Sequence, residues 1–268
     1  MIRRRFVFVL VALAVCLASF SHIDTVDAQP TAPAGRIGVL TGGTWPNETT
    51  REFRQAMREA GYDEGHNLVI EWRPAGGNYD RLPQLALDLI QSKVDVIVVD
   101  STLGTRALKR ATSTIPIVMA FVSDPVGSGL VPSLSHPGGN VTGVSMMTTE
   151  LSLKRLQLFK DALPQLTRVA VLWNPQTPAH NKVVELLASA APSLSIDIKF
   201  VAVKKPEDLG AAFSAIRRAH VQAIDVLEEP MFSTHRATIF RLASASQLPT
   251  IYWDRRLASG GLMYSWRA

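Results

Sequence analysis

The sequence has very little cysteine, and this shortage excludes several kinds of site. Cys16 is the one cysteine among 268 residues, and it lies in an apolar stretch near the N-terminus. If that stretch is removed on export, the remaining chain has no cysteine. A disulfide, a Cys-x-x-Cys zinc site and a cysteine nucleophile are then all excluded.

Motifs of common enzyme families are also missing. There is no G-x-x-x-x-G-K-[ST] phosphate loop, no H-E-x-x-H, no G-x-S-x-G elbow, and no G-x-G-x-x-G after the first expected strand. The six histidines, at 22, 66, 136, 180, 220 and 235, show no metal-ligand spacing, and each is interpreted as a surface or loop residue. The sequence therefore shows none of the obvious signatures of a catalytic or metal site.

Strong charge of one sign is absent as well. The chain has 28 Lys and Arg against 23 Asp and Glu. Removal of residues 1–28 takes away three arginines and two aspartates, which leaves 25 against 21 and a surplus of four. No stripe of Lys and Arg is interleaved with aromatic residues, so the composition argues against nucleic-acid binding.

The N-terminus has the layout of a secretory signal peptide. Three arginines at 3–5 precede an apolar run at 6–20, and small residues at Val26-Asp27-Ala28 suit cleavage after Ala28. The run is shorter than the ~20 apolar residues of a membrane-spanning helix, although an uncleaved anchor stays an alternative. A lipoprotein box at 13–16 and a twin-arginine route rank below ordinary secretion. The expected location is the periplasm.

From Arg36 onward, apolar runs alternate with amphipathic segments. Strands are expected at 36–41, 67–75, 94–100, 115–122 and 140–145, then at 168–175, 195–203, 223–229 and 249–254. Helices are expected at 49–62, 80–92 and 102–113, then at 149–166, 177–192, 205–220 and 233–247. This rhythm predicts an α/β protein with parallel sheets and two Rossmann-like lobes, residues 35–143 and 144–262.

The ends of the expected strands carry the candidate binding residues. In open α/β sheets, ligands bind beyond the carboxyl ends of the strands. The residues at these ends that could contact a ligand are Thr41, Gly42, Ser101, Thr102, Ser123, Asp124, Asn174, Glu228 and Glu229.

Two chemical roles are predicted among them, each with a structural alternative. Ser101 and Thr102 stand at a helix N-terminus, which suits a carboxylate, although one of them could simply cap the helix. Glu228 and Glu229 close an otherwise apolar strand and could hold an ammonium group, or be solvated loop acids. Asp124 precedes a proline, and the alternative to a binding role is that it ends its strand with a turn.

Asn174 also precedes a proline and carries the same turn alternative. Trp173 could stack on a ligand, but it alternates with two valines along its strand. Core packing is therefore the favoured interpretation of Trp173.

Several segments resemble one family. They include RIGVLTGG, IPIVMAFVSDPVGSGLVPSLSHPGGNVTGVS, LSLKRLQLFKDALPQLTRVAVLWNP and LPTIYWDRRLASGGLMYS. Together they are similar to bacterial ABC-transporter substrate-binding proteins of the tryptophan/tyrosine-binding type. The resemblance implies a type I periplasmic-binding-protein fold, with two α/β lobes around a ligand cleft. It also implies a receptor for a small ligand, often an amino acid, that serves an inner-membrane ABC permease without cofactor or catalysis.

Two alternatives to import stay open at this point. A periplasmic ligand sensor could have the same fold, and an enzyme could be built on the same two-lobed scaffold. The resemblance has one departure, because family members continue past the GGLM segment whereas this chain has Tyr264-Ser265-Trp266 and stops. Residues 263–268 are therefore expected to be an aberrant or truncated end, and the chain a poor binder.

Overall fold

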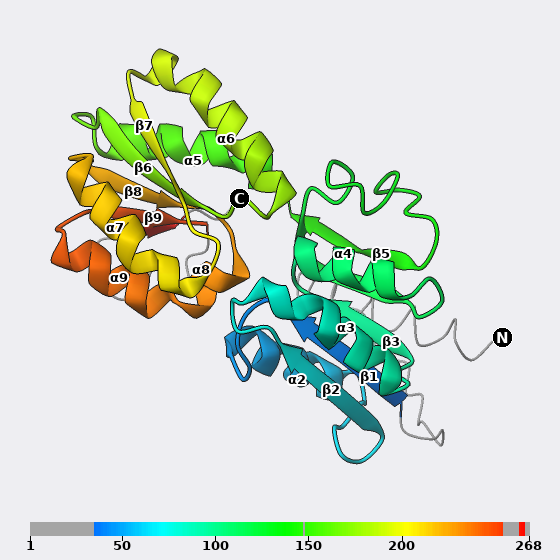
Figure 1. Cartoon of the computed structure of the whole chain (residues 1–268). Coiled ribbons are helices and arrows are strands. Elements are labelled where there is room, and N and C mark those ends of the chain that lie inside the picture. The colour runs from blue at the N-terminus through cyan, green and yellow to red at the C-terminus, as the bar shows by residue number, and fades with distance from the viewer. Residues whose placement is uncertain (1–34, 147, 254–262, 266–268) are drawn as a thin grey trace. The chain divides into compact units, whose positions relative to one another are not determined.

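The computed structural model describes residues 35–146, 148–253 and 263–265 (Figure 1). The predicted signal peptide, residues 1–28, lies outside the described residues. The chain divides after Ser145 into two compact units, called unit 1 and unit 2 below. The boundary expected between residues 143 and 144 falls slightly earlier in the chain, within strand β5.

Unit 1 is built on a five-stranded sheet with strand order β2-β1-β3-β4-β5. Its strands are β1 (Gly35–Thr41), β2 (Leu68–Pro74), β3 (Val96–Val99), β4 (Ile117–Ser123) and β5 (Val141–Met146). β1 pairs in parallel with β2 and β3, and β3 pairs in parallel with β4. The helical segments are α2 (Glu48–Glu59), the 3-10 turn η1 (Tyr79–Arg81), α3 (Leu82–Gln91) and α4 (Thr102–Ala111).

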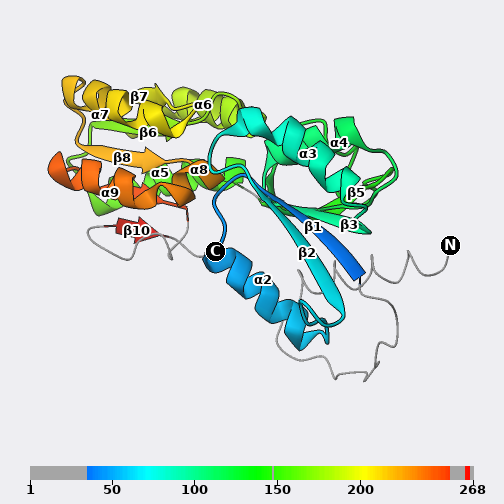
Figure 2. The same ribbon diagram turned by 60° about the horizontal axis from the view of Figure 1, so that its bottom comes forward.

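Helices cover both faces of the unit 1 sheet, with α2 on one face and α3 and α4 on the other (Figure 2). The four residues of β3 are all buried, as expected for a strand that packs on both faces. On the α2 face, Met57 packs against Ile37 and Val98. On the opposite face, Gly38 allows a close approach of α3, because an added Cβ would lie 3.0 Å from a Leu89 methyl.

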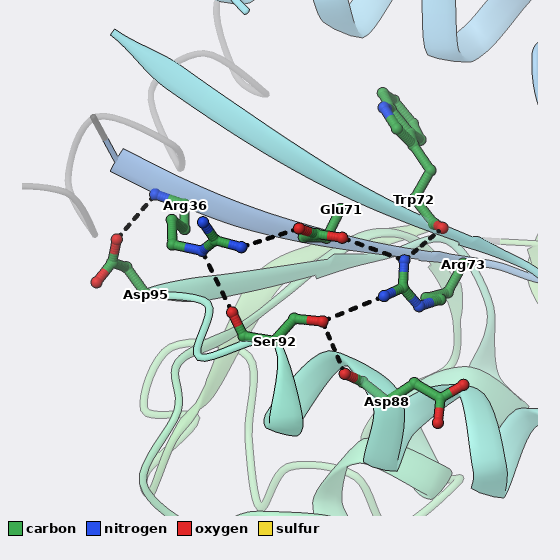
Figure 3. Close-up of polar contacts among 7 residues, drawn as sticks. All are labelled: Arg36, Glu71, Trp72, Arg73, Asp88, Ser92 and Asp95. Carbon is green, nitrogen blue, oxygen red and sulfur yellow. Dashed lines mark hydrogen bonds and ion pairs between the residues drawn. The ribbon is translucent and has the colours of Figure 1, made fainter. Parts of the chain in front are cut away.

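A polar network joins β1, β2 and the end of α3 at the edge of unit 1 (Figure 3). The Glu71 carboxylate pairs with Arg36 at 2.9 Å and with Arg73 at 3.3 Å. Both guanidinium groups also donate to Ser92, at its carbonyl and its hydroxyl. Because these groups are partly exposed, each ion pair contributes little free energy, and the network mainly fixes how α3 meets the sheet.

Unit 2 repeats the same architecture with strand order β10-β9-β8-β6-β7. Its strands, all paired in parallel, are β6 (Arg168–Trp173), β7 (Asp197–Ala202), β8 (Ala223–Val226), β9 (Thr250–Tyr252) and β10 (Met263–Ser265). The helices are α5 (Thr148–Ala162), α6 (Pro178–Ala190), α7 (Leu209–Arg218), α8 (Pro230–Thr234) and α9 (Arg236–Ala245). Two 3-10 turns, η2 (Ala191–Leu194) and η3 (Pro206–Asp208), complete the unit.

One hydrophobic core of unit 2 lies between its sheet and the helix pair α5 and α6. Leu156 and Phe159 of α5, and Val183 of α6, pack with Val169 and Val171 of β6, and all five are at most 2% exposed. The opposite face is covered by α7 and α9, which contact each other (Figure 1). The prediction of two α/β lobes with parallel sheets is thus confirmed.

Two local expectations differ from the structure. The strand expected at 223–229 ends at Val226, so that the two glutamates lie in the following loop. The single helix expected at 233–247 is two helices, α8 and α9, which meet at His235. Of the end expected to be aberrant, Met263–Ser265 are described and pair in register with β9.

Candidate functional site

The predicted residues of unit 1 gather at one edge of its sheet. Thr41 is the last residue of β1, Ser123 is the last residue of β4, and α4 begins shortly after β3. These three strands are neighbours in the sheet. Since all three strands run in the same direction, their carboxyl ends meet at this edge. The candidates Thr41, Gly42, Ser101, Thr102, Ser123 and Asp124 therefore form one group, called cluster 1.

Asp100 holds cluster 1 together, a role that the strand pattern did not predict. Its carboxylate accepts a hydrogen bond from the Thr41 hydroxyl and one from the Gly42 amide at 2.8 Å. Burial raises the pKa of Asp100, while these two hydrogen bonds oppose the rise. The residue thus ties the loop after β1 to the end of β3.

The backbone of Gly42 is fully used within unit 1. Its amide donates to Asp100, and its carbonyl accepts from the Gly77 amide at 2.8 Å. Ala75 and Gly76 donate in the same way to Thr41 and Gly43. The pairing of β1 with β2 therefore continues past both strands, and the Gly42 position shapes the edge of the sheet.

Ser101 caps α4, so the structural alternative for this residue is confirmed. Its side chain accepts from the Gly104 amide at 3.1 Å, and its carbonyl accepts from the Thr105 amide at 2.9 Å. Thr102 is 5% exposed, and its hydroxyl lies 3.4 Å from the Ser123 carbonyl. The cap places the positive end of the α4 dipole at cluster 1, where an anionic ligand group would be stabilised.

Asp124 starts the loop that follows β4. Its φ of 41° lies in the left-handed region, and its carboxylate accepts from the Gly127 amide at 2.8 Å. The turn interpretation is therefore confirmed. Further along, this loop contacts α4, because Lys109 of that helix donates to the Leu130 carbonyl at 2.5 Å.

The predicted residues of unit 2 also meet at a carboxyl edge. Asn174 follows β6, and Glu228 and Glu229 follow β8, the neighbouring strand. Asn174 is fully buried and its Oδ1 accepts from the Gln176 amide at 3.0 Å, so it forms the predicted turn. We call Asn174, Glu228 and Glu229 cluster 2.

The two glutamates of cluster 2 differ in environment. Glu229 is 2% exposed, stands at the N-cap of α8, and accepts from the Thr177 hydroxyl at 2.8 Å. Glu228 is partly exposed. The interpretation of both as solvated loop acids is wrong for Glu229, because Thr177 binds it in the interior.

His180 is buried on α6, so its interpretation as a surface or loop residue is wrong. Its Nε2 lies 2.8 Å from the Glu228 carbonyl, and its Nδ1 lies 3.0 Å from the Asn174 amide. Burial lowers the pKa of His180 to about 4. The neutral ring therefore has its proton on Nε2, facing the carbonyl, and accepts from the amide at Nδ1. Only its spacing of six residues from Asn174 hinted at this contact.

A buried ion pair lies beneath cluster 2. Arg155 of α5 binds Asp225 of β8 through two hydrogen bonds, of 2.8 and 3.2 Å. The side chains are 7% and 0% exposed. Burial raises the pKa of Asp225, and the arginine acts against that rise. Sequence reasoning treated this strand as apolar apart from its end, so it missed the pair.

Some buried polar groups without hydrogen-bond partners lie at the ends of the unit 2 strands. Among the described residues they include Asn174 Nδ2, Trp173 Nε1 at the end of β6 and the Tyr252 hydroxyl at the end of β9. Trp173 also packs against the core, in agreement with its favoured interpretation. Buried donors of this kind are normally satisfied, so they mark where a ligand group could add a contact.

Other site types have no support in the part of the chain that the structure describes. Within residues 35–146, 148–253 and 263–265, no three His, Cys, Asp or Glu side chains are placed to hold a metal ion. None of the helices in those ranges has the length and apolar character needed to cross a membrane.

Solved structures of other proteins have the same fold as this chain. A solved structure of a conserved domain protein from Vibrio cholerae is 27% identical, covers 87% of this chain and 79% of its own, and superposes with a TM-score of 0.78. An ABC domain from Streptococcus pneumonia, solved in complex with L-Trp, shares the fold at 23% identity, with coverages of 86% and 79% and a TM-score of 0.73. The predicted type I periplasmic-binding-protein fold is confirmed.

Sequence comparison leads to the same family. The tyrosine-binding protein of Clostridioides difficile is 28% identical over 221 residues, which are 81% of this chain and 62% of the relative. The chain thus spans less than two thirds of that relative's length. The family model for ABC transporter substrate binding protein matches residues 46–266. The chain therefore belongs to the family of ABC transporter substrate-binding proteins.

Proposed function

We propose that this chain is the ligand-binding component of an ABC importer, which binds an α-amino acid and delivers it to a membrane permease. The match of the family model across residues 46–266 carries this proposal. Residues 1–28 serve as a signal peptide for export, and the chain acts in the periplasm. It binds its ligand without cofactor and without chemical conversion.

Each cluster suits one of the two charged groups of an amino acid. Cluster 1 offers the N-terminus of α4, where backbone amides and the helix dipole favour a carboxylate. Cluster 2 offers Glu228, whose partly exposed position suits an ammonium group better than the buried position of Glu229. One relative is named a tyrosine-binding protein, and a protein of the same fold was solved in complex with L-Trp. Both favour an aromatic amino acid as the ligand.

A matched pair of variants tests the carboxylate half of this proposal. Because Ser101 caps α4, replacement by alanine would confuse loss of the cap with loss of the ligand contact. Asn and Asp are both good caps, and they differ by one negative charge. We expect Ser101→Asn to bind L-tyrosine within a few fold of the parent chain, and Ser101→Asp to bind at least tenfold more weakly.

Isothermal titration calorimetry gives the affinities, and thermal melts verify that both variants are folded. If folded Ser101→Asn and Ser101→Asp bind equally well, the ligand carboxylate does not bind at cluster 1. A parent chain that binds no amino acid would contradict the proposed function itself.

A further inference from the structure

We propose that His180 is a positioning residue of the binding site: its imidazole joins the loop after β6 to the loop after β8 and so fixes Asn174 and Glu228 relative to each other. This inference rests on the proposed function for the role of those two residues in binding. The contacts that carry it all lie within unit 2.

Backbone pairing holds the two loops only at their starts. β6 and β8 are parallel neighbours, with Leu172 opposite Val226. The Leu227 amide donates to the Leu172 carbonyl at 3.0 Å, which is the last backbone link between these two chain segments among the described residues. The site residues Asn174 and Glu228 come directly afterwards, so other groups must hold them.

His180 supplies this link through both ring nitrogens. Nε2 donates to the Glu228 carbonyl at 2.8 Å, and Nδ1 accepts from the Asn174 amide at 3.0 Å. The Asn174 carbonyl lies 3.2 Å from the same Nδ1, but it is an acceptor and cannot bond to an unprotonated nitrogen. One neutral ring in one tautomer thus satisfies a buried amide on one loop and a carbonyl on the other.

A second contact supports the same two loops. The Thr177 hydroxyl donates to Glu229 at 2.8 Å, one residue beyond the carbonyl that His180 binds. The Asn174 side chain is held by the Gln176 amide at its Oδ1, whereas its Nδ2 has no partner among the described residues. The clamp therefore holds Asn174 in place while its side-chain Nδ2 stays available as a donor. Because the residue is already ordered, binding costs less conformational entropy.

Side-chain variants separate the two halves of the clamp. His180→Asn keeps an acceptor near the position of Nδ1, His180→Gln keeps a donor near the position of Nε2, and His180→Ala removes both. His220→Asn is the matched control, because His220 is exposed and its φ of 48° suits asparagine. Each variant is made in the full chain.

Two measurements need no ligand. The imidazole ¹⁵N spectrum should show His180 as a single Nε2–H tautomer at pH 7. The Asn174 amide should exchange slowly in the parent chain, at least tenfold faster in His180→Ala, and at a restored rate in His180→Asn. An Nδ1–H tautomer, or unchanged exchange in a folded His180→Ala, would overturn the clamp.

Affinity for L-tyrosine is the third measurement. We expect roughly tenfold weaker binding by His180→Ala, with part of the affinity regained in His180→Asn or His180→Gln and no change in His220→Asn. Undiminished binding by His180→Ala would overturn the positioning role. If the parent chain binds no L-tyrosine, the tyrosine assignment fails on its own, and the spectrum and the exchange rates still decide the clamp.

Discussion

Asp100 and His180 belong to different units but make the same kind of contact. Asp100 binds the Thr41 hydroxyl and the Gly42 amide, and so joins the ends of β3 and β1. His180 joins the loops after β6 and β8. In both cases a polar side chain links loops that leave neighbouring strands, which makes the carboxyl edge rigid without covering it.

Acid should weaken the fold through His180. Burial and, to a smaller extent, the charge of nearby Arg155 lower its pKa to about 4, although the backbone carbonyls of Glu228 and Asn174, which would accept from a protonated ring, oppose the fall. An unfolded histidine titrates near its ordinary pKa of about 6.5. Between these values only the unfolded chain takes up the proton, so the free energy of unfolding falls as the pH falls from about 6.5 to about 4. The full contribution, present above pH 6.5, is about 3 kcal/mol.

The raised pKa values of Asp100 and Asp225 act in the opposite direction, because the unfolded chain releases those protons first as the pH rises. Comparison with His180→Gln therefore isolates the histidine. Urea unfolding between pH 4 and pH 7 should show the advantage of the parent chain shrinking by roughly 3 kcal/mol toward pH 4. Parallel stability curves for the two proteins would contradict the assigned pKa.

At the scale of elements, Gly143 fixes how β5 joins its sheet. Its φ of 134° is unfavourable for other residues, and an added Cβ would overlap the backbone of Met119 on β4. We expect Gly143→Ala to lower the free energy of unfolding by at least about 2 kcal/mol, since the backbone would have to move.

Gly210→Ala is the control for this change. Gly210 lies in helix α7, and a Cβ there would meet no atom within 4 Å. This variant should gain about 0.5–1 kcal/mol. Urea unfolding measures both effects, and a Gly143→Ala protein as stable as the parent chain would show that β5 does not require glycine.

The alternation of apolar and amphipathic segments was sufficient to predict most elements. The near-continuous apolar run of β3 and the well-signalled helix α7 are examples, because their patterns arise from local periodicity. The end of β8 was placed too late, since Leu227 continues the apolar run although the ladder stops at Val226. The break between α8 and α9 at His235 has no glycine or proline to signal it.

The candidate site was predictable only in part. Residues at strand ends follow from chain order, so the grouping of Thr41 with Ser101 could be foreseen. The contacts of His180 with Glu228, and of Arg155 with Asp225, join residues 48 and 70 positions apart. Such pairings depend on the packing of helices on the sheet, which a single sequence does not specify.

At the scale of the whole molecule, the chain has two α/β units, each with a polar cluster at the carboxyl edge of a parallel sheet. It belongs to a family of substrate-binding proteins and spans 62% of the tyrosine-binding relative. The binding proposal assigns the carboxylate of the amino acid to cluster 1 and its ammonium group to cluster 2.

Calorimetric titration with three related compounds tests that assignment most directly. L-tyrosine has both charged groups, tyramine lacks the carboxylate, and 3-(4-hydroxyphenyl)propionate lacks the ammonium group. We predict that L-tyrosine binds and that each analogue binds at least tenfold more weakly, because each leaves one cluster without its charged partner. If L-tyrosine does not bind, or if either analogue binds equally well, recognition of tyrosine through its two charged ends is contradicted.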